Sequence, residues 1–254
     1  KLVFDFDDAI WLRDTSPANR RFDWLKRPEK TARIAAAADM VFAGNAYLAD
    51  YARRLNDDVR VVPTTVDTDV YDAAPTPKPD GRVCVGWTGS ITTIKHFDLA
   101  VPVLRRVRER FGDRVYFKVI GDAGYRNDEL GIRGQAYRAE RAVEDLTELD
   151  VGLMPLPDDE WARGKCGFKG LQYMALRIPT IMSPVGVNTE IISDGDNGYL
   201  AASEDQWVAR IGELVESAED RRRLGEAARR TVVERYSVAS QKHAYLGHLR
   251  DVLR

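Results

Sequence analysis

Short apolar runs alternate with helix-forming stretches along the first 62 residues. The apolar runs are four to six residues long and rich in Val and Phe, which is typical of strands in a parallel sheet. We expect strands at residues 1–6, 39–44 and 59–63, helices at 27–37 and 45–55, and a polar loop through Pro17 after the first strand. This order predicts a sheet whose strands are joined by helical crossovers.

A second alternation begins at Arg82. Its expected strands are 82–87, 115–122, a short one near 131–134, 151–157, 179–183 and 198–202, and its expected helices are 97–111, 140–149, 168–176, 189–193 and 204–217. Ser203 and Gln206 form a capping box at the start of the last of these helices. Two basic helices, 219–236 and 239–253, finish the chain with one buried face each, and we expect their Arg-rich face to be solvated.

The stretch between the two alternations is rich in Pro, Asp and Thr and has no period, so it predicts an interdomain linker. We divide the chain into a first domain at 1–64, the linker at 65–81, a second domain at 82–236, and a terminal helix at 237–254 that packs back toward the first domain. The predicted fold class is α/β, with an open parallel sheet, helices on both faces and right-handed crossovers.

The composition of the chain narrows the range of functions to consider. The 254 residues (28.6 kDa) are 44% hydrophobic and 31% charged, with a net charge of -2. This balance argues against nucleic acid as the main partner, which requires a basic excess. No apolar run approaches the roughly 18 residues that span a membrane. Cys84, Cys166 and the three histidines show no metal-ligand spacing, so we expect no metal and a reducing, cytoplasmic setting.

The chain starts directly in the apolar run "KLVFDF" without an initiator methionine. We interpret this as an expressed fragment, a cleaved product or part of a longer chain.

In an open parallel sheet, ligands bind beyond the carboxyl ends of the strands. After the first strand of the second domain, "GWTGSITTIK" brings Gly86 and Gly89, which free the backbone for a tight turn, and Lys95 near the next helix. Backbone amides, a helix start and one ammonium make an anion site. An ordinary glycine-rich turn with a surface lysine explains this segment equally well, and Asp122 after a later strand is best explained as a turn.

A longer loop, "DDEWARGKCGFKG", precedes the helix at 168–176. It delivers Gly164, Lys165 and Gly167 to the helix start, and Lys169 follows on the first turn. A phosphate at this helix terminus is favourable, because the dipole and both ammonium groups attract it. The loop is also longer than packing requires, which is typical of binding loops.

The turn "PVGVN" follows the next strand. Gly186 allows the backbone to approach a ligand closely, and Glu190 is placed to accept hydrogen bonds from hydroxyl groups or to cap its own helix. Together the three loops at one sheet edge indicate a ligand with phosphates and hydroxyls, such as a nucleotide sugar.

These residues carry a family resemblance. The block at 165–200, "KCGFKGLQYMALRIPTIMSPVGVNTEIISDGDNGYL", resembles the carboxy-terminal signature of glycosyltransferase family 4, whose members have the GT-B fold. The segments "VGWTGSITTIKHFDL", "FKVIGD", "ELDVGLMPLP" and "RRRLGEAARRTVVERYS" support it, and the likeness weakens before residue 83. The resemblance implies transfer of a sugar from a UDP- or GDP-linked donor, with retention of configuration, no bound metal and no cofactor.

The resemblance also implies roles for individual residues. Lys95 would grip the donor diphosphate, the amides of Phe168 and Lys169 would meet the phosphates, and Glu190 would lie near the sugar. Lys95 and Glu190 are the best candidates for transition-state support, although no catalytic residue is assigned. The implied donor site comprises Gly86, Gly89, Ser90, Lys95, Lys165, Gly167, Phe168, Lys169, Gln172, Gly186, Val187, Asn188 and Glu190.

Three departures from the family pattern matter. Family members commonly carry two glutamates around this helix. In this chain Gly164 stands at the first of these positions and Gln172 at the second. Ser90 stands where family members often have an arginine. A neutral amide binds a ribose hydroxyl less strongly than a carboxylate does. Residues 1–62 match only the back half of an acceptor-side Rossmann-like domain, so we expect a chain that carries mainly the donor-binding half.

Alternatives remain. The loss of both glutamates fits a non-catalytic nucleotide-sugar binding module, and a GT-B nucleotide-sugar epimerase is a weaker candidate. The segment "DFDDAI" resembles the Asp-x-Asp start of a phosphatase or a metal motif, but Ala9 and Asp8 depart from the phosphatase pattern, and a structural or acceptor-side role is favoured. The expected acceptor is a sugar, a lipid-linked or a small molecule. Peripheral contact with the inner face of the membrane and self-association are left open.

Overall fold

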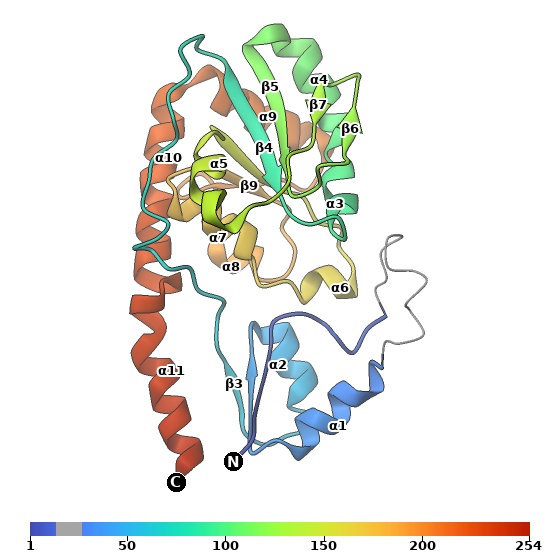
Figure 1. Ribbon diagram of the computed structural model, residues 1–254, viewed down its shortest axis with the longest axis vertical. Coiled ribbons are helices and arrows are strands. Elements are labelled where there is room, and N and C mark those ends of the chain that lie inside the picture. The colour runs from blue at the N-terminus through green and yellow to red at the C-terminus, as the bar shows by residue number, and fades with distance from the viewer. Residues whose placement is uncertain (14–26) are drawn as a thin grey trace.

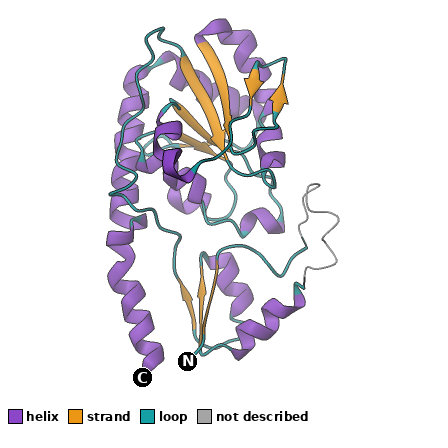
Figure 2. Cartoon of the chain, in the orientation of Figure 1, coloured by secondary structure: helices purple, strands orange, loops and turns teal. Residues whose placement is uncertain are grey.

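The computed structural model describes residues 1–13 and 27–254. Within these residues the chain forms one parallel sheet near its amino terminus and a second, larger parallel sheet in its middle (Figure 1). The arrowheads of the two sheets point toward each other, so that their carboxyl ends face one another (Figure 2). We call these parts the amino-terminal and the carboxy-terminal unit. The expected loop through Pro17 lies outside the described residues.

The amino-terminal sheet has the order β1-β2-β3, with β1 at Val3–Phe6, β2 at Met40–Ala43 and β3 at Val59–Val61. The crossover helices α1 (Glu29–Ala37) and α2 (Ala46–Ala52) bury Ala35, Leu48 and Ala52 against Val41 on one face of the sheet. The side chain of Asn45 caps α2 by accepting a hydrogen bond from the amide of Leu48 at 2.9 Å. These elements follow the expected alternation closely.

The other face of this sheet is covered from the opposite end of the chain. Helix α11 (Val238–Leu253) runs alongside the amino-terminal sheet in Figure 1 and packs Val252 against Met40 and Phe42 of β2. The rings of Tyr245 and His248 lie 5.4 and 5.9 Å from the ring of Phe42. The last helix therefore completes the core of the first unit.

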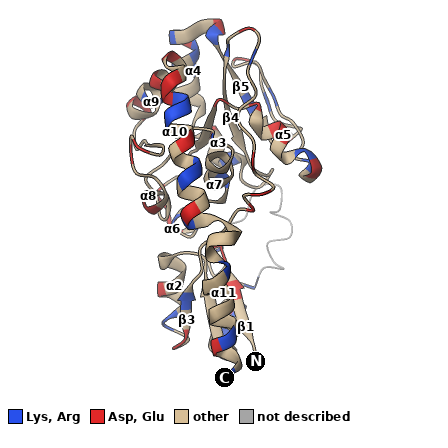
Figure 3. Ribbon diagram, turned by 90° about the vertical axis from the view of Figure 1, so that its left-hand side faces the viewer, with Lys and Arg blue, Asp and Glu red and all other residues tan. Residues whose placement is uncertain are grey.

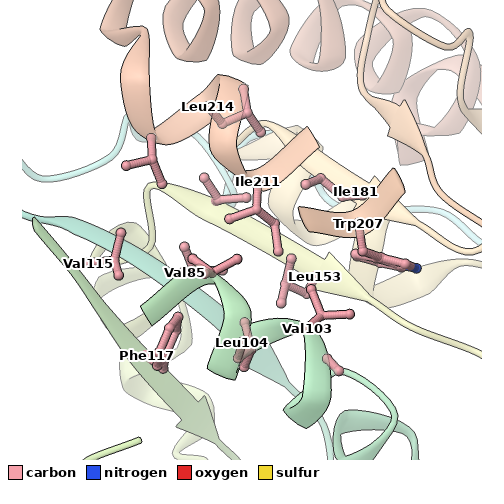
Figure 4. Packing of buried hydrophobic residues seen from close by; sticks show 14 of the residues in the cluster. Val85, Val103, Leu104, Val115, Phe117, Leu153, Ile181, Trp207, Ile211 and Leu214 are labelled. Carbon is pink, nitrogen blue, oxygen red and sulfur yellow. The ribbon is translucent and has the colours of Figure 1, made fainter. Parts of the chain in front are cut away.

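The carboxy-terminal sheet has the order β10-β9-β8-β4-β5. Its strands are β4 (Val83–Thr88), β5 (Val115–Ile120), β8 (Val151–Met154), β9 (Thr180–Met182) and β10 (Tyr199–Leu200). Helices α4 (Val101–Phe111) and α9 (Glu204–Glu216) cover one face, where Leu104 and Ile211 pack against Val85 (Figure 4). On the opposite face, α5 (Ala142–Thr147) and α7 (Phe168–Ala175) place Leu146 and Tyr173 in a second core. The predicted α/β class, with helices on both faces of a parallel sheet, is confirmed.

Several elements differ from the expectation in detail. The helix expected at 97–111 is two helices, α3 (Ile94–Asp98) and α4, because the chain turns at Leu99 and Ala100 before Pro102 opens the second. A short hairpin of β6 (Arg126–Asn127) and β7 (Ile132–Arg133) follows β5. The long loop before α7 contains α6 (Glu160–Arg163), which Asp159 caps, and α8 (Asn188–Ile191) follows β9. Short 3-10 turns lie at Gly112–Arg114 and Ala139–Arg141.

Helix α10 (Ala218–Thr231) continues into a π-helical turn at Val232–Tyr236 before α11 begins. Basic and acidic segments alternate along α10 in Figure 3. The expectation of a fully solvated arginine face is wrong for Arg229, whose side chain is only 12% exposed. It donates hydrogen bonds to the carbonyl oxygens of Ala175 (2.8 Å), Thr68 (2.9 Å) and Tyr71, and so ties the connecting segment to α7.

Candidate donor site

A cavity of about 330 Å³ opens at the carboxyl end of β4, between the β4–α3 loop and the start of α7. Five of its lining residues belong to the set expected from the sequence: Gly89, Ser90, Phe168, Lys169 and Gln172. The sequence interpretation did not select the remaining lining residues, Thr88, Thr93 and Tyr137. Two loops that are about 80 residues apart in the chain thus meet at one hollow, as the rule for parallel sheets requires.

The β4–α3 loop is held by a dense set of short contacts. The buried hydroxyl of Tyr173 accepts a hydrogen bond from the amide of Thr88 at 2.6 Å, and the amide of Gly89 donates to the carbonyl of Ile120 at 2.9 Å. Gly121 has a φ of 124°, and a Cβ there would lie 1.8 Å from the carbonyl oxygen of Gly89. Only glycine tolerates this approach, so the backbone at Gly89 is fixed in place.

The start of α7 supplies the second wall. Gly167 precedes the helix with a φ of 74°, a conformation that turns the chain into the helix, and Phe168 at the first helical position is exposed at the cavity. The amides of Phe168 and Lys169 lie in the first turn, where backbone N–H groups lack partners within the helix. Their dipoles and orientation favour an anion in front of them.

Lys169 brings a cation to the same wall. Its Nζ lies 3.4 Å from Thr93 Oγ1 and 5.2 Å from the centroid of the Trp87 ring. Burial, together with the nearby Lys165, lowers the pKa of Lys169 to about 8. The ammonium is therefore predominantly protonated at pH 7, in a setting that an anionic ligand would stabilise.

Gln172 lies deeper in α7 and is 4% exposed, yet it reaches the cavity. Its Nε2 donates a hydrogen bond to the hydroxyl of Tyr71 at 2.7 Å, and Tyr71 belongs to the segment that connects the two units. The side chain of Tyr137 lies near that of Tyr71, and burial together with this neighbour raises the pKa of Tyr137. No pattern in the sequence pairs these three side chains.

The turn after β9 lies next to the start of α7. A Cβ at Gly167 would lie 3.5 Å from Val187 Cγ1 and 3.8 Å from Asn188 Oδ1. Asn188 is 1% exposed and donates from Nδ2 to the carbonyl of Ser183 at 3.0 Å, but among the described residues its Oδ1 has no hydrogen-bond partner. Gly186 has a φ of 55° and packs on the carbonyl of Arg163.

Glu190 has an exposed side chain on α8 and is not among the residues that line the described cavity. No side-chain cap is formed at the start of α8, so the capping role considered for Glu190 is not observed in the described structure. Lys95 lies half-buried on α3 and is likewise not among the cavity-lining residues. The structure places Lys169, rather than Lys95, directly at the cavity wall.

Gly86 and Lys165 also have other surroundings than expected. Gly86 lies inside β4, not in a turn, and a Cβ there would lie 2.2 Å from Leu149 Cδ2, so its small size makes room for the segment between α5 and β8. Lys165 is not among the cavity-lining residues: its Nζ lies 2.7 Å from Asp8 Oδ1 and 5.0 Å from the Trp161 ring centroid. The turn role of Gly86 is thus wrong, and Lys165 joins the two units.

The carboxyl end of β1 docks against the loop before α7. A Cβ at Gly164 would lie 2.7 Å from Ala9 Cβ, so the amino-terminal unit occupies the space that a side chain at position 164 needs. Burial raises the pKa of Cys166 to about 12, and the protonated thiol donates to the carbonyl of Asp7 at 3.2 Å. Asn45 Nδ2 donates to the carbonyl of Lys165 at 3.1 Å.

A second cavity of about 650 Å³ lies between the carboxyl ends of the amino-terminal strands and α11. Asp5, Asp7, Thr64 and Tyr245 are among its lining residues. Burial and the neighbouring Asp7 raise the pKa of Asp5. Among the described residues, no group of three or more His, Cys, Asp or Glu side chains is arranged to hold a metal ion.

With this geometry in place, the chain can be compared with known proteins. A family model described as "Glycosyl transferases group 1" matches residues 82–217, more than half of the sequence. The chain belongs to this family. The matched region contains the described residues that line the cavity at β4, so the family match and the site lie in the same part of this group 1 glycosyl transferase.

Solved structures and one curated relative extend the comparison. TarM of S. aureus aligns with a TM-score of 0.69 at 18% identity over 87% of this chain. Anabaena Alr3699/HepE, solved in complex with UDP and glucose, aligns with a TM-score of 0.71 at 15% identity over 98% of this chain and 71% of its own. These likenesses show the fold, which is that of the GT-B glycosyltransferases.

In sequence, spore coat protein SA of Bacillus subtilis is 42% identical over 60 residues, which is 22% of this chain and 16% of that protein. The chain spans 45% of the TarM chain. Within the described residues, no helix is both long and apolar enough to cross a membrane.

Proposed function

We propose that this chain binds a nucleotide sugar in the cavity at β4 and takes part in retaining sugar transfer of the family 4 type. The observation that carries the proposal is the convergence of the Lys169 ammonium, the amides at the start of α7 and the Gly89 loop on one hollow. Backbone N–H groups and one cation at a helix start are the usual means of binding phosphates.

The chemistry of the cavity walls supports the following orientation of the donor. The diphosphate takes the position in front of Phe168 and Lys169, with Ser90 and Thr93 offering hydroxyl groups from the opposite loop. The ribose lies toward Gln172. The sugar extends past Gly167 toward the turn after β9, where Asn188 Oδ1 has no hydrogen-bond partner among the described residues.

In this arrangement the protein supplies electrostatic support for the leaving group. When the bond between the sugar and the diphosphate breaks, negative charge grows on the phosphate oxygen. The α7 dipole and the Lys169 ammonium are already oriented toward that position, which is the form of stabilisation that costs no reorganisation. We propose that this cation and dipole replace a bound metal and that no cofactor is required. Glu190 and Lys95 remain candidates that act only if the loops around them close on the donor.

The first donor base to test is uracil, because Alr3699/HepE was solved with UDP and with UDP-glucose; GDP-linked sugars are the alternative. A sugar, lipid-linked or small-molecule acceptor would enter from the side of the amino-terminal unit, where Asp5 and Asp7 line the larger cavity. A cytoplasmic location, contact with a membrane surface and self-association stay predictions from the sequence.

A non-catalytic binding module is the second candidate. Two observations favour it: Gln172 is neutral, and the packing of Ala9 excludes a side chain at position 164. Such a module would bind the nucleotide sugar through the same cavity without turning it over, so binding and turnover must be measured separately.

The test is calorimetric titration with UDP, UDP-glucose and GDP in the presence of EDTA, for the wild-type chain and for Lys169→Ala and Lys95→Ala. Loss of a hydrogen bond to a charged group costs about 1.5–3 kcal/mol, so we expect Lys169→Ala to weaken binding by roughly 10- to 100-fold. Lys95→Ala should have a smaller effect. Absence of binding by the wild type, or binding only with magnesium, would contradict the proposal.

A further inference from the structure

The segment that connects the two units lies against the donor cavity and is held there by its backbone. Arg229 donates to the carbonyl oxygens of Thr68 and Tyr71, and the amide of Tyr71 donates to the carbonyl of Asp67 at 2.9 Å. The Tyr71 ring packs, half-buried, against the apolar clusters on the α7 side of the carboxy-terminal sheet. The position of the segment is therefore set without the hydroxyl of Tyr71.

That hydroxyl is used elsewhere. It accepts the hydrogen bond from Gln172 Nε2 at 2.7 Å. Gln172 and Tyr137 both line the cavity, whereas Tyr71 is not among its lining residues. The hydrogen bond from Gln172 thus connects a lining residue with the segment between the units, and Tyr137 lies near the same hydroxyl.

The contact matters because the two ends of a glutamine amide have nearly the same shape and opposite hydrogen-bonding character. A glutamate presents acceptors in either rotation, but a glutamine presents an acceptor only when its nitrogen is held on the other side. The bond to Tyr71 engages Nε2 and directs the carbonyl Oε1 to the opposite side of the amide. A ribose hydroxyl that donates a hydrogen bond needs such an acceptor.

We propose that Tyr71 is a positioning residue for the ribose of the donor: it fixes the rotation of the Gln172 amide so that Oε1 accepts a hydrogen bond from a ribose hydroxyl. The inference rests on the proposed binding of a nucleotide in this cavity. It assigns a role in recognition to the connecting segment, which makes the nucleoside end of the site dependent on the junction between the units.

The test compares Tyr71→Phe with the wild type in titrations with UDP, 2′-deoxy-UDP and 3′-deoxy-UDP, and with the corresponding guanine nucleotides. Removal of one hydrogen bond changes affinity by roughly 3- to 10-fold. We expect Tyr71→Phe to weaken UDP binding by that factor and to have no effect on the deoxynucleotide that lacks the hydroxyl contacted by Gln172. Gln172→Leu should show the same selectivity for the same hydroxyl.

Two further variants sharpen the result. In Gln172→Glu either carboxylate oxygen can accept, so adding Tyr71→Phe to this variant should cost less than it does beside Gln172. Tyr199→Phe serves as the matched control, because Tyr199 is a buried tyrosine on β10, away from the cavity, and its hydroxyl interacts with Glu213 of α9. It should leave all affinities unchanged.

The outcomes separate this inference from the proposed function. If the wild type binds no ribonucleotide, the proposed function fails and the role of Tyr71 with it. If the wild type binds UDP but Tyr71→Phe weakens the ribo- and both deoxyribonucleotides by the same factor, or weakens none, the positioning role is overturned while the nucleotide site stands. Thermal melting of each variant shows whether a uniform loss reflects unfolding.

Discussion

The two units use the same strand-and-helix pattern but complete their cores in different ways. The carboxy-terminal sheet is covered on both faces by helices that lie near its strands in sequence, such as α4 and α7. Among the described residues, the amino-terminal sheet receives α1 and α2 from its own segment and takes α11 from the far end of the chain for its second face. The carboxy-terminal sheet is thus covered by helices from its own part of the chain, whereas the amino-terminal sheet depends on α11 from the end of the chain.

The site follows this division. Within the part of the chain that the structure describes, the residues that line the donor cavity belong to the carboxy-terminal unit. The amino-terminal unit contributes contacts to the loop before α7, through Asp8, Ala9 and Asn45. The described residues of the amino-terminal unit contact this loop but do not line the cavity. Damage to this unit should therefore act on the site indirectly, and variants in each unit test the comparison.

The largest effect is expected from Phe42→Ala. Phe42 lies on β2, where it is fully buried against α11. Truncation of a buried phenylalanine costs about 3–5 kcal/mol. That is a large share of the stability of a small unit. We expect the amino-terminal sheet to lose its structure while the carboxy-terminal sheet stays folded, as measured by hydrogen exchange of the strands in each sheet.

The matched control is Phe97→Ala, which truncates an equally buried phenylalanine in the carboxy-terminal unit, beside the Trp87 ring. Its effect should appear in the carboxy-terminal strands. If Phe42→Ala instead opened both sheets in one transition, the units would form one cooperative body and the comparison would fail.

The second prediction concerns the close backbone approach in the carboxy-terminal unit. Gly121→Ala places a Cβ 1.8 Å from the Gly89 carbonyl oxygen at a φ of 124°. Overpacking and the unfavourable φ together cost roughly 2–4 kcal/mol, and the Gly89 loop must shift. We expect lower thermal stability and a loss of UDP affinity.

Gly131→Ala is the control for the backbone conformation alone, because Gly131 also has a positive φ, 66°, but no atom lies within 4 Å of its Cβ position. It should cost only about 1–2 kcal/mol and leave UDP affinity intact. Equal effects of the two variants would show that the loop is not held by this packing.

The sequence predicts those features that depend on neighbours along the chain. Apolar runs of four to six residues define the strands, and the capping box of Ser203 and Gln206 marks the start of α9. The loops at the carboxyl edge follow from topology, which is why Gly89, Phe168 and Lys169 could be placed together in advance. Local pattern and sheet rules therefore account for the fold and the outline of the site.

What the sequence does not show is which side chains meet across long separations. Tyr71 and Gln172 are 101 residues apart, and Asp8 and Lys165 are 157 apart. Their pairing depends on how the two units dock, which no local pattern encodes. For the same reason Gly86 was assigned to a turn: a strand glycine that makes room for Leu149 and a turn glycine look alike until the packing is known.

The third prediction uses the pKa of Lys169, about 8. Only the protonated ammonium attracts phosphate, so UDP affinity should be constant below pH 8 and fall by up to about tenfold per pH unit above it. Protonation of Lys169 has the opposite effect on the stability of the fold. The folded-state pKa lies below the ordinary 10.5, so protonated Lys169 destabilises the fold below pH 8, and the penalty fades as pH rises toward 10.5.

Lys169→Arg separates this effect from other titrations. Arginine stays charged across the range, so the decline in UDP affinity between pH 8 and 9.5 should disappear in calorimetric titrations. A decline that persists unchanged in Lys169→Arg would mean that another group controls binding.

The smallest effect is expected at the junction of the units. The Asp8 and Lys165 side chains are 36% and 17% exposed, so their ion pair should contribute only about 0.2–1 kcal/mol, measured by a double-mutant cycle of Asp8→Asn and Lys165→Met in urea.

The informative readout is the pH at which UDP affinity begins to fall. Asp8 raises the pKa of Lys169 and Lys165 lowers it, so Asp8→Asn should move that pH downward and Lys165→Met upward. Shifts in opposite directions at nearly constant stability would show that the amino-terminal unit tunes the phosphate cation across the junction. Shifts in the same direction would mean that the variants act by loosening the loop before α7, and the two units would then be coupled by packing alone.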